Sequence, residues 1–352
     1  MHVGFLLPGS LETTTGGYLY DRQLIQALRD RDVTVTTVIA PADRSYRHRL
    51  LDNIRLRRRL TPAHFDIMLH DELAHPSAVA ITRSTDTVPI ISLVHLLRTD
   101  EPRHWMDRLL TGSLERYYLR SVDGFIHNSQ TTKRAVESVV DDAPSVVAYP
   151  GTDHFGPPVP TDTIPRRTTT DPFRIVFVGT IIPRKGPDTL VAALAELDGN
   201  WECTIVGDRT VNPSFSRTLA AMVDSYPHAD RIQLTGRISH STLRTVLADA
   251  HVLAVPSRYE AYGIVYTEAM AVGTVPLAST AGAGPELLAD GRAGLLVPPD
   301  DPTALAGALQ SVLDDRDHLA TLAVAARERY DDLPTWEDTA TTIHIFMEEL
   351  IR

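Results

Sequence analysis

Residues 256–286, PSRYEAYGIVYTEAMAVGTVPLASTAGAGPE, form the stretch from which the rest of the chain is best understood. Two glutamates in it, Glu260 and Glu268, are separated by seven residues. On one continuous helix these side chains would lie about 80° apart, so they would not share a face. The spacing favours Glu260 in a loop and Glu268 on the helix that follows, which we expect to begin near Gly263.

A helix that begins there leaves the backbone N–H groups of Gly263, Ile264 and Val265 without helical partners, and such a helix start is an anion site. The segment then offers a carboxylate in the loop, N–H donors at the helix start and a second carboxylate about a turn further on. A sugar hydroxyl, a diphosphate and a ribose diol would use these features. The alternative is a solvated Glu260 and a Glu268 on an ordinary amphipathic helix that ends by Gly273.

The segment SRYEAYGIVYTEAMAVGTVP resembles the Glu-x7-Glu motif of the retaining family 4 glycosyltransferases (glycosyl transferases group 1), which have the GT-B fold. The resemblance extends from about Phe173 to Asp314 and, more loosely, over the rest of the chain. It implies an α/β protein with two doubly wound, Rossmann-like domains that face each other across a cleft. It also implies that Glu260 orients the donor sugar and that Glu268 lies beside the ribose hydroxyls.

The composition agrees with a two-domain protein of this kind. A chain of 352 residues is long enough for two domains, and its net charge of −11 argues against a general nucleic-acid binder. The single cysteine, Cys203, excludes an intramolecular disulfide and indicates a reducing compartment. The opening MHVGFLLPGS has no basic region, and its apolar run is too short for a signal peptide or a membrane span. We therefore expect a cytoplasmic protein.

Near the N-terminus, Gly16 and Gly17 stand between an apolar strand over residues 3–7 and the helical pattern YLYDRQLIQALRD. A strand, a glycine turn and a helix in this order allow the backbone to approach a phosphate. A tight turn that needs a positive φ at one glycine is the alternative. The family resemblance implies that this loop faces the donor diphosphate.

FDIMLH and PIISLVH predict two further strands, which end at His70 and His95. Asp71 and Glu72 would follow the first of them in a loop. Because ligands of open α/β sheets bind outside the carboxyl ends of the strands, we expect the acceptor near these four side chains. A histidine at a strand end is also commonly a structural hydrogen-bonding group. The resemblance implies that His95 lies near the transferred sugar, as a catalytic residue.

From Arg44 to Arg59 the chain reads RSYRHRLLDNIRLRRR, with seven arginines. Leucine and isoleucine residues interleave with them, so the segment reads as a basic amphipathic helix. Such a helix either presents a solvated face or attracts an anionic lipid surface or a phosphorylated acceptor. Peripheral contact with an anionic membrane, on its cytoplasmic face, is therefore one prediction for this segment.

The segment AYPGTDHFGPPVPTDTIPRRTTTDPF is rich in Pro, Thr and Gly and predicts an interdomain connection. We expect an acceptor-side domain over residues 1–152, a linker over 153–172 and a nucleotide-sugar-binding domain over 173–334. Its YPGTDHF resembles the family's turn at the end of the first domain, with Pro150 and Thr152 in place of Asn and Val. The last helix, over 335–352, is expected to pack back on the first domain.

Lys185 is one of only two lysines in the chain and stands directly before Gly186, after the buried strand RIVFVG. A compact point charge at a strand-to-helix junction suits a diphosphate. In the family, a lysine at this position holds the donor diphosphate. The family's arginine after the strand glycine is replaced here by Thr180, and Arg184 is the candidate for supplying the missing charge.

The turn Gly236-Arg237-Ile238 resembles the place where the nucleotide base lies against the backbone in this family. The expected catalytic residues are Glu260 and His95. The expected donor-binding residues are Gly16, Gly17, Arg184, Lys185, Arg237, Ile238, Tyr262, Gly263, Ile264, Val265 and Glu268. The donor would be a UDP-, GDP- or ADP-sugar and the acceptor a hydroxyl group. No metal or other cofactor is expected, because no His, Asp and Cys cluster has ligand spacing.

Three other classes of protein compete with this interpretation. An NAD-dependent dehydrogenase would need Gly-x-Gly-x-x-Gly between a strand and a helix, and no junction here reads that way. A GT-B epimerase or phosphorylase is closer, but a phosphorylase would need a lysine for pyridoxal phosphate. A non-catalytic nucleotide-sugar-binding protein would keep the ribose and base contacts and show no turnover.

Overall fold

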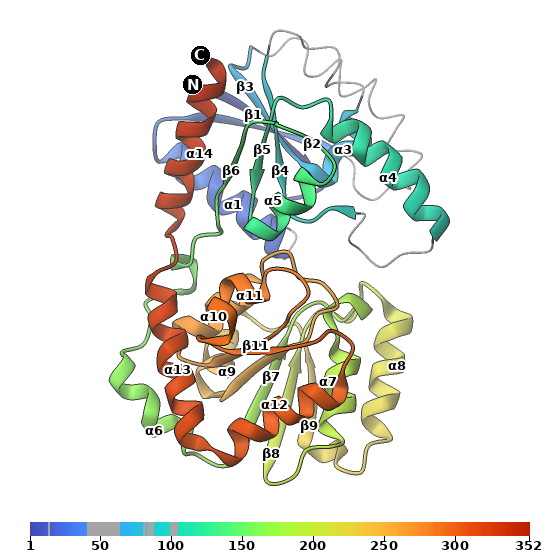
Figure 1. Cartoon of the computed structure of the whole chain (residues 1–352), viewed down its shortest axis with the longest axis vertical. Coiled ribbons are helices and arrows are strands. Elements are labelled where there is room, and N and C mark those ends of the chain that lie inside the picture. The colour runs from blue at the N-terminus through green and yellow to red at the C-terminus, as the bar shows by residue number, and fades with distance from the viewer. Residues whose placement is uncertain (13–14, 41–63, 80–81, 83–87, 99–104) are drawn as a thin grey trace. The chain divides into compact units, whose positions relative to one another are not determined.

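The computed structural model of the chain describes residues 1–12, 15–40, 64–79, 82, 88–98 and 105–352. The contacts divide the chain into two units (Figure 1). Unit 1 comprises Met1–Gly151 and Pro334–Arg352, and unit 2 comprises Thr152–Leu333. The arginine-rich segment from Arg44 to Arg59 lies outside the described residues. Over the part of the chain that is described, none of the helices has the length and apolar character needed to cross a membrane.

Unit 1 contains a parallel sheet of six strands in the order β2-β1-β3-β4-β5-β6. Its strands are β1 (His2–Pro8), β2 (Thr34–Ala40), β3 (Ile67–Asp71), β4 (Ile90–Val94), β5 (Gly124–His127) and β6 (Ser145–Val147). Its helices include α1 (Gly16–Arg29), η1 (Glu72–Ala74), α3 (His75–Ala78), α4 (Trp105–Leu119), α5 (Gln130–Glu137) and α14 (Trp336–Ile351). Every residue of β3 and β4 is buried, which is why these strands read as apolar runs in the sequence.

The last helix, α14, belongs to unit 1 although it is the most distant segment in the sequence. It runs beside α1 in Figure 1, and five of its side chains join the core that α1 and the sheet form. These side chains are Trp336, Ala340, Ile343, Phe346 and Met347. Thr335 and Asp338 form a capping box that fixes the start of the helix. The expected packing of the C-terminal helix on the first domain is thus present.

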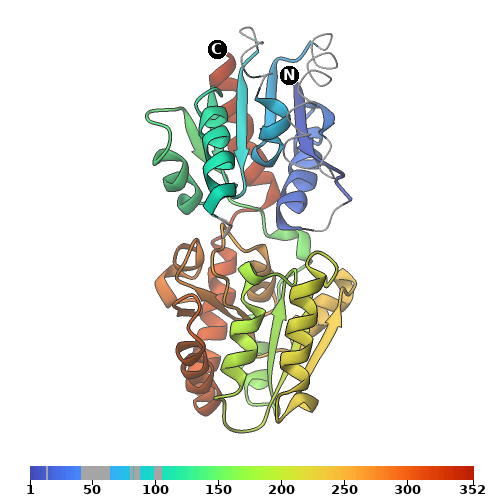
Figure 2. The ribbon, with the colours of Figure 1, turned by 90° about the vertical axis from the view of Figure 1, so that its right-hand side faces the viewer.

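Unit 2 contains a second parallel sheet of six strands, in the order β12-β11-β10-β7-β8-β9. Its strands are β7 (Phe173–Val178), β8 (Trp201–Val206), β9 (Ile232–Gly236), β10 (Val252–Val255), β11 (Val275–Ser279) and β12 (Leu295–Val297). This is a doubly wound order: from β7 the chain first adds β8 and β9 on one side and then β10, β11 and β12 on the other side. In such sheets, ligands bind beyond the carboxyl ends of the two strands where the winding reverses, here β7 and β10. Figure 2 shows α7 (Pro187–Leu194) and α8 (Pro213–Asp224) side by side over the sheet.

The other α-helices of unit 2 are α6 (Ile164–Thr168), α9 (His240–Asp249), α10 (Ile264–Ala271), α11 (Gly284–Leu287), α12 (Pro302–Asp314) and α13 (Arg316–Asp331). Short 3-10 helices lie at η3 (Asp153–Phe155), η4 (Thr161–Thr163), η5 (Pro183–Lys185), η6 (Ala229–Arg231) and η7 (Ala289–Gly291).

The stretch over 153–172, which reads as a linker in the sequence, packs with unit 2 and carries η3, η4 and α6. Val159 N–H donates to the Ala271 carbonyl at 2.9 Å, and Arg327 Nε donates to the Val159 carbonyl at 2.9 Å. The Tyr330 hydroxyl donates to the Thr152 carbonyl at 3.0 Å. These partners belong to α10 and α13, which lie far along the chain. The composition of residues 153–172 therefore could not predict that the stretch packs with unit 2.

Candidate active site

The carboxyl ends of β7 and β10 bring two loops of unit 2 together at the point where the sheet order reverses. The loop after β7 carries η5, which ends at Lys185, and Gly186 then adopts a left-handed φ of 68°. A Cβ atom at Gly186 would overlap the Pro256 carbonyl of the loop after β10, so only glycine allows this approach. Arg258 N–H donates to the Arg184 carbonyl at 2.8 Å and joins the same two loops.

Lys185 and Glu260 form an ion pair in this place, between Lys185 Nζ and Glu260 Oε2. Their side chains are 16% and 11% exposed, so the pair is shielded but reachable from solvent. Ser257 Oγ also donates to Glu260 Oε2 at 3.2 Å. Burial disfavours the charged form of Glu260, but the charges of Lys185 and Arg184 outweigh burial and lower the pKa of Glu260. Burial, opposed by Glu260, lowers the pKa of Lys185.

Arg184 is held in the same loop, where its Nη1 donates to the Tyr259 carbonyl at 3.1 Å. Its charge acts on both Lys185 and Glu260, because it contributes to lowering both pKa values. Within the described residues its buried Nε has no hydrogen-bond partner. Thr180, which stands where the family has an arginine, is half-buried at the end of the β7 strand. Arg184 therefore places a second cation beside Glu260.

Helix α10 begins where the sequence predicts, with Gly263 as its N-cap at a φ of 92°. A Cβ atom at Gly263 would overlap the Tyr266 ring, so the turn requires glycine. Ile264 and Val265 are half-buried in the first turn, and Tyr262 just before the helix is 4% exposed. The start of α10, with its unpaired N–H groups and positive dipole end, thus follows directly on the Glu260 loop.

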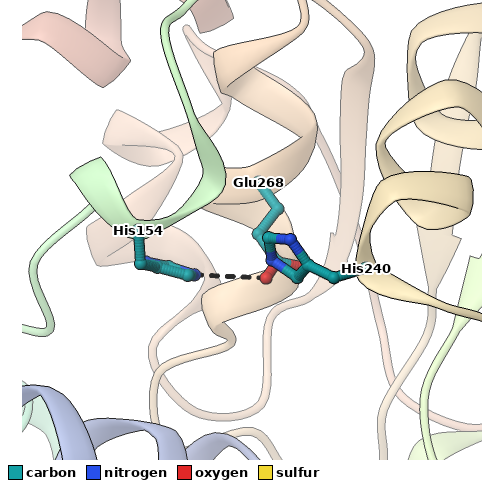
Figure 3. Close-up of side chains that lie close together, drawn as sticks. All are labelled: His154, His240 and Glu268. Carbon is teal, nitrogen blue, oxygen red and sulfur yellow. Dashed lines mark hydrogen bonds and ion pairs between the residues drawn. The ribbon is translucent and has the colours of Figure 1, made fainter.

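Glu268 lies in the second turn of α10, as predicted, and is 7% exposed. His154 Nε2 lies 3.2 Å from Glu268 Oε1. His240, the first residue of α9, lies close to both, as Figure 3 shows. The imidazole of His240 packs edge-on against Phe155, with ring centroids 4.9 Å apart.

The turn after β9 is also formed as expected. Gly236 has a φ of 74°. The Arg237 side chain is 55% exposed, and its Nη1 lies 3.5 Å from Asp208 Oδ2. Ile238, the next residue, is half-buried. The surface that the resemblance assigns to the nucleotide base is therefore open at Arg237.

In unit 1, His95 directly follows β4 and is 6% exposed. Its Nε2 lies 3.0 Å from Asp21 Oδ1, on α1. Burial disfavours the imidazolium, but Asp21 outweighs burial and raises the pKa of His95 to about 9. Gly16 opens α1, and a Cβ atom at Gly17 would lie 3.4 Å from the His95 ring. The two glycines therefore lie in the first turn of α1, neither with a positive φ, and Gly17 is next to the predicted catalytic histidine.

The remaining strand-end residues are more buried than the sequence suggests. His70 lies in β3 as predicted, but the strand continues to Asp71, and Glu72 opens η1 instead of lying in a loop. His70 and Glu72 are 0% exposed and Asp71 is 2% exposed, because β3 is a central strand with both faces covered. Burial lowers the pKa of His70 to about 3, so its ring is neutral at pH 7. Of the four predicted acceptor residues, His95 is the most exposed, and direct contact with an acceptor remains a prediction for His95 and for Asp71 beside it.

Asp71, Asp21 and His95 form a buried triad. One carboxylate oxygen of each aspartate and one ring nitrogen of His95 all lie within 4.8 Å of one another. Burial and the charge of Asp21 raise the pKa of Asp71 to about 8. Sequence reasoning missed Asp21. It stands on the buried face of α1 with Leu24, Ile25 and Leu28, and an acid within such an apolar stripe signals a buried partner. Sequence reasoning also missed His154 as a neighbour of Glu268. The residues around it have the composition of a linker, so no apolar stripe indicates a buried partner.

Two family models match the chain. The model described as Glycosyl transferases group 1 matches residues 161–329, and the model described as Glycosyltransferase Family 4 matches residues 14–154. The chain belongs to glycosyltransferase family 4. In this family 4 protein, the matched segments cover most of unit 2 and most of unit 1 respectively.

Similar curated proteins carry glycosyltransferase names. Glycogen synthase of Mycobacterium tuberculosis is 28% identical over 288 residues, which are 77% of this chain and 66% of that protein. D-inositol 3-phosphate glycosyltransferase of Xylanimonas cellulosilytica is 34% identical over 190 residues, or 51% of this chain and 46% of that protein. The family 4 chain therefore matches less than two thirds of the length of either relative.

Solved structures show the fold over the whole chain. Sucrose-phosphate synthase from Thermosynechococcus elongatus has a TM-score of 0.86 at 23% identity and covers 99% of this chain and 98% of its own. Anabaena HepE in complex with UDP-glucose has a TM-score of 0.78 at 18% identity, with 99% and 100% covered. The fold of this family 4 member is thus the α/β, two-domain, Rossmann-like GT-B fold.

Proposed function

We propose that this protein is a retaining glycosyltransferase, which moves a sugar from a nucleoside-diphosphate donor to a hydroxyl acceptor. The observation that carries the proposal is the Lys185–Glu260 pair with Arg184, set at the sheet reversal of unit 2 and directly before the start of α10. Two cations around one carboxylate leave positive charge for a diphosphate, and a helix start adds N–H donors.

Each feature of unit 2 takes one part of the donor in this proposal. Lys185 and Arg184 hold the diphosphate, with the N–H groups of Gly263, Ile264 and Val265. Glu268 accepts hydrogen bonds from the ribose hydroxyls, and the Arg237-Ile238 turn lies along the base. The complexes of Anabaena HepE with UDP and UDP-glucose support a nucleotide-sugar donor.

The reaction that we propose uses this arrangement and the retention that the family resemblance implies. Glu260 orients the donor sugar, and the leaving diphosphate takes the proton of the attacking hydroxyl on the same face of the ring. The bond from the anomeric carbon to the diphosphate breaks as the bond to the acceptor oxygen forms, through an oxocarbenium-like state. His95 and Asp71 of unit 1 contact the acceptor or the transferred sugar. The step needs no metal, so we expect that EDTA does not lower the rate.

Donor binding tests the assignment of the phosphate site. Lys185→Ala should weaken UDP binding, measured by calorimetry, by about 1–3 kcal/mol, the range for a charge-assisted contact. Lys133→Ala is the matched control, because Lys133 is the other lysine and pairs with Glu137 on α5 of unit 1. Equal UDP affinity in the wild type and Lys185→Ala would refute the assignment.

Turnover separates a transferase from a non-catalytic nucleotide-sugar-binding protein. The purified chain is incubated with UDP-, GDP- and ADP-glucose and a panel of hydroxyl acceptors, including maltooligosaccharides and inositol phosphate, which the names of its relatives suggest. We expect nucleoside diphosphate release with one donor, and an α-linked product by NMR. An inverted anomer would contradict retention, and donor binding without product over the panel would favour the binding protein.

A further inference from the structure

Three side chains at the predicted ribose end of the donor site have the composition of a transition-metal site. His154 comes from η3, His240 from the start of α9 and Glu268 from α10. Their ligating atoms all lie within 4.8 Å of one another, and His154 Nε2 is 3.2 Å from Glu268 Oε1. Figure 3 shows His154 pointing toward the Glu268 carboxylate from η3 and the His240 imidazole reaching the same carboxylate from the start of α9.

This geometry is close to that of a bound zinc ion. With Zn–N and Zn–O bonds of about 2.0–2.2 Å, ligands of a tetrahedral site lie roughly 3.4 Å from one another. The His154–Glu268 separation of 3.2 Å is close to this value, so a movement of at most about 1.5 Å would bring His240 into place. His240 is exposed at the first position of its helix, so its side chain can make that movement by shifting against the Phe155 ring.

The segment that carries His154 is fixed against the helix that carries His240. Arg244 of α9 donates through Nη1 to the Phe155 carbonyl at 2.7 Å and through Nη2 to the Pro157 carbonyl. The Arg244 guanidinium also lies over the Phe155 ring, 5.6 Å from its centroid. The backbones that present the two imidazoles are therefore held together without a metal, which reduces the ordering that binding requires.

We propose that His154, His240 and Glu268 bind one zinc-class divalent ion, and that this ion and the donor ribose exclude each other. Two imidazoles and one carboxylate are ligands that Zn²⁺ prefers, and they leave a fourth position for water. The exclusion rests on the proposed function, because there Glu268 accepts hydrogen bonds from the ribose hydroxyls. A zinc ion on Glu268 takes up one carboxylate oxygen and stands, with its water ligand, where the ribose hydroxyls would approach that carboxylate.

Calorimetry with ZnCl₂ tests the metal site directly on the full chain after treatment with a chelating resin. We expect one tight site, at least 10-fold weaker in His240→Ala. This variant leaves the buried His154–Glu268 contact in place and removes an exposed side chain, so it should fold. His228→Ala is the matched control, because His228 is an exposed histidine elsewhere in unit 2. Equal zinc affinity in the wild type and His240→Ala would overturn the proposal.

UDP affinity measured with and without saturating zinc tests the exclusion. Because the diphosphate itself binds zinc in solution, the informative quantity is the difference between the wild type and His240→Ala. We expect zinc to weaken UDP binding at least 5-fold more in the wild type. Equal weakening in both overturns the exclusion. Zinc binding is measured without any sugar transfer, so an inactive protein that binds zinc as expected would count against the proposed function alone.

Discussion

The buried charge clusters of the two units have opposite compositions. In unit 2, two cations, Lys185 and Arg184, act on one carboxylate, Glu260. In unit 1, two carboxylates, Asp21 and Asp71, lie about one imidazole, His95. The first cluster lowers the pKa of its carboxyl group, and the second raises the pKa of His95 to about 9 and of Asp71 to about 8. Unit 2 therefore holds spare positive charge for an anionic ligand, whereas unit 1 holds protons near neutral pH.

The largest effect is expected for Glu260→Gln. This change removes the carboxylate and leaves both cations, so the rate of sugar transfer should fall about 100- to 1,000-fold, the usual loss for one preorganised electrostatic contact. UDP binding should not weaken, because Lys185 and Arg184 are then both available to the diphosphate. Steady-state kinetics and calorimetry measure the two quantities, with Glu202→Gln, an exposed glutamate of unit 2, as the control. A parallel loss of UDP affinity would show that the cluster acts as a single structural unit.

In unit 1 the matching change is Asp21→Asn. It removes the charge that raises the pKa of His95, so that pKa should fall from about 9 by at least one unit in an NMR titration. The free energy of unfolding should fall by about 2 kcal/mol, because a buried hydrogen bond to a charged group is weakened. Asp30→Asn, at the exposed end of the same helix, serves as the control. An unchanged His95 titration would mean that Asp21 does not hold the proton on the imidazole.

The last contrast is the pH dependence of each unit's stability. His95 and Asp71 have raised pKa values, so the folded unit 1 retains protons that the unfolded chain has already released. Each retained proton should therefore lower the stability of unit 1 by about 1.4 kcal/mol per pH unit as the pH rises, between about 4 and 8 for Asp71 and between about 6.5 and 9 for His95. Unit 2, where the pKa values of Glu260 and Lys185 are lowered, should not show this loss.

Urea unfolding followed by methyl NMR can report the two units separately. Ile91 is buried in unit 1 and Ile205 in unit 2, so each resonance follows its own core. The difference between the two urea midpoints should change with pH in the wild type and change less in Asp71→Asn. If both urea midpoints fall equally as the pH rises, the two clusters do not give the two units different pH dependences of stability, and the prediction is wrong.

The sequence by itself determined the features that depend on near neighbours. Apolar runs predicted the buried parallel strands β4 and β7, because a strand covered on both faces has no polar side to show. The spacing of Glu260 and Glu268 predicted a helix that begins near Gly263, which is confirmed. Ser129 is the N-cap of α5 and accepts the Thr132 N–H at 3.0 Å. Caps, glycine turns and hydrophobic periodicity depend on residues a few positions apart, so they can be predicted from the sequence alone.

Only the tertiary structure decided which charged side chains meet. Asp21 and His95 are 74 residues apart in the chain, and His154 and Glu268 are 114 apart. Neither pairing follows from local spacing, because each depends on how strands are ordered and on which helix covers them. The same order buries His70 and Glu72 completely, since β3 lies at the centre of its sheet. A side chain's polarity is fixed by its type, but its exposure, its partners and hence its pKa are fixed by the segments packed around it.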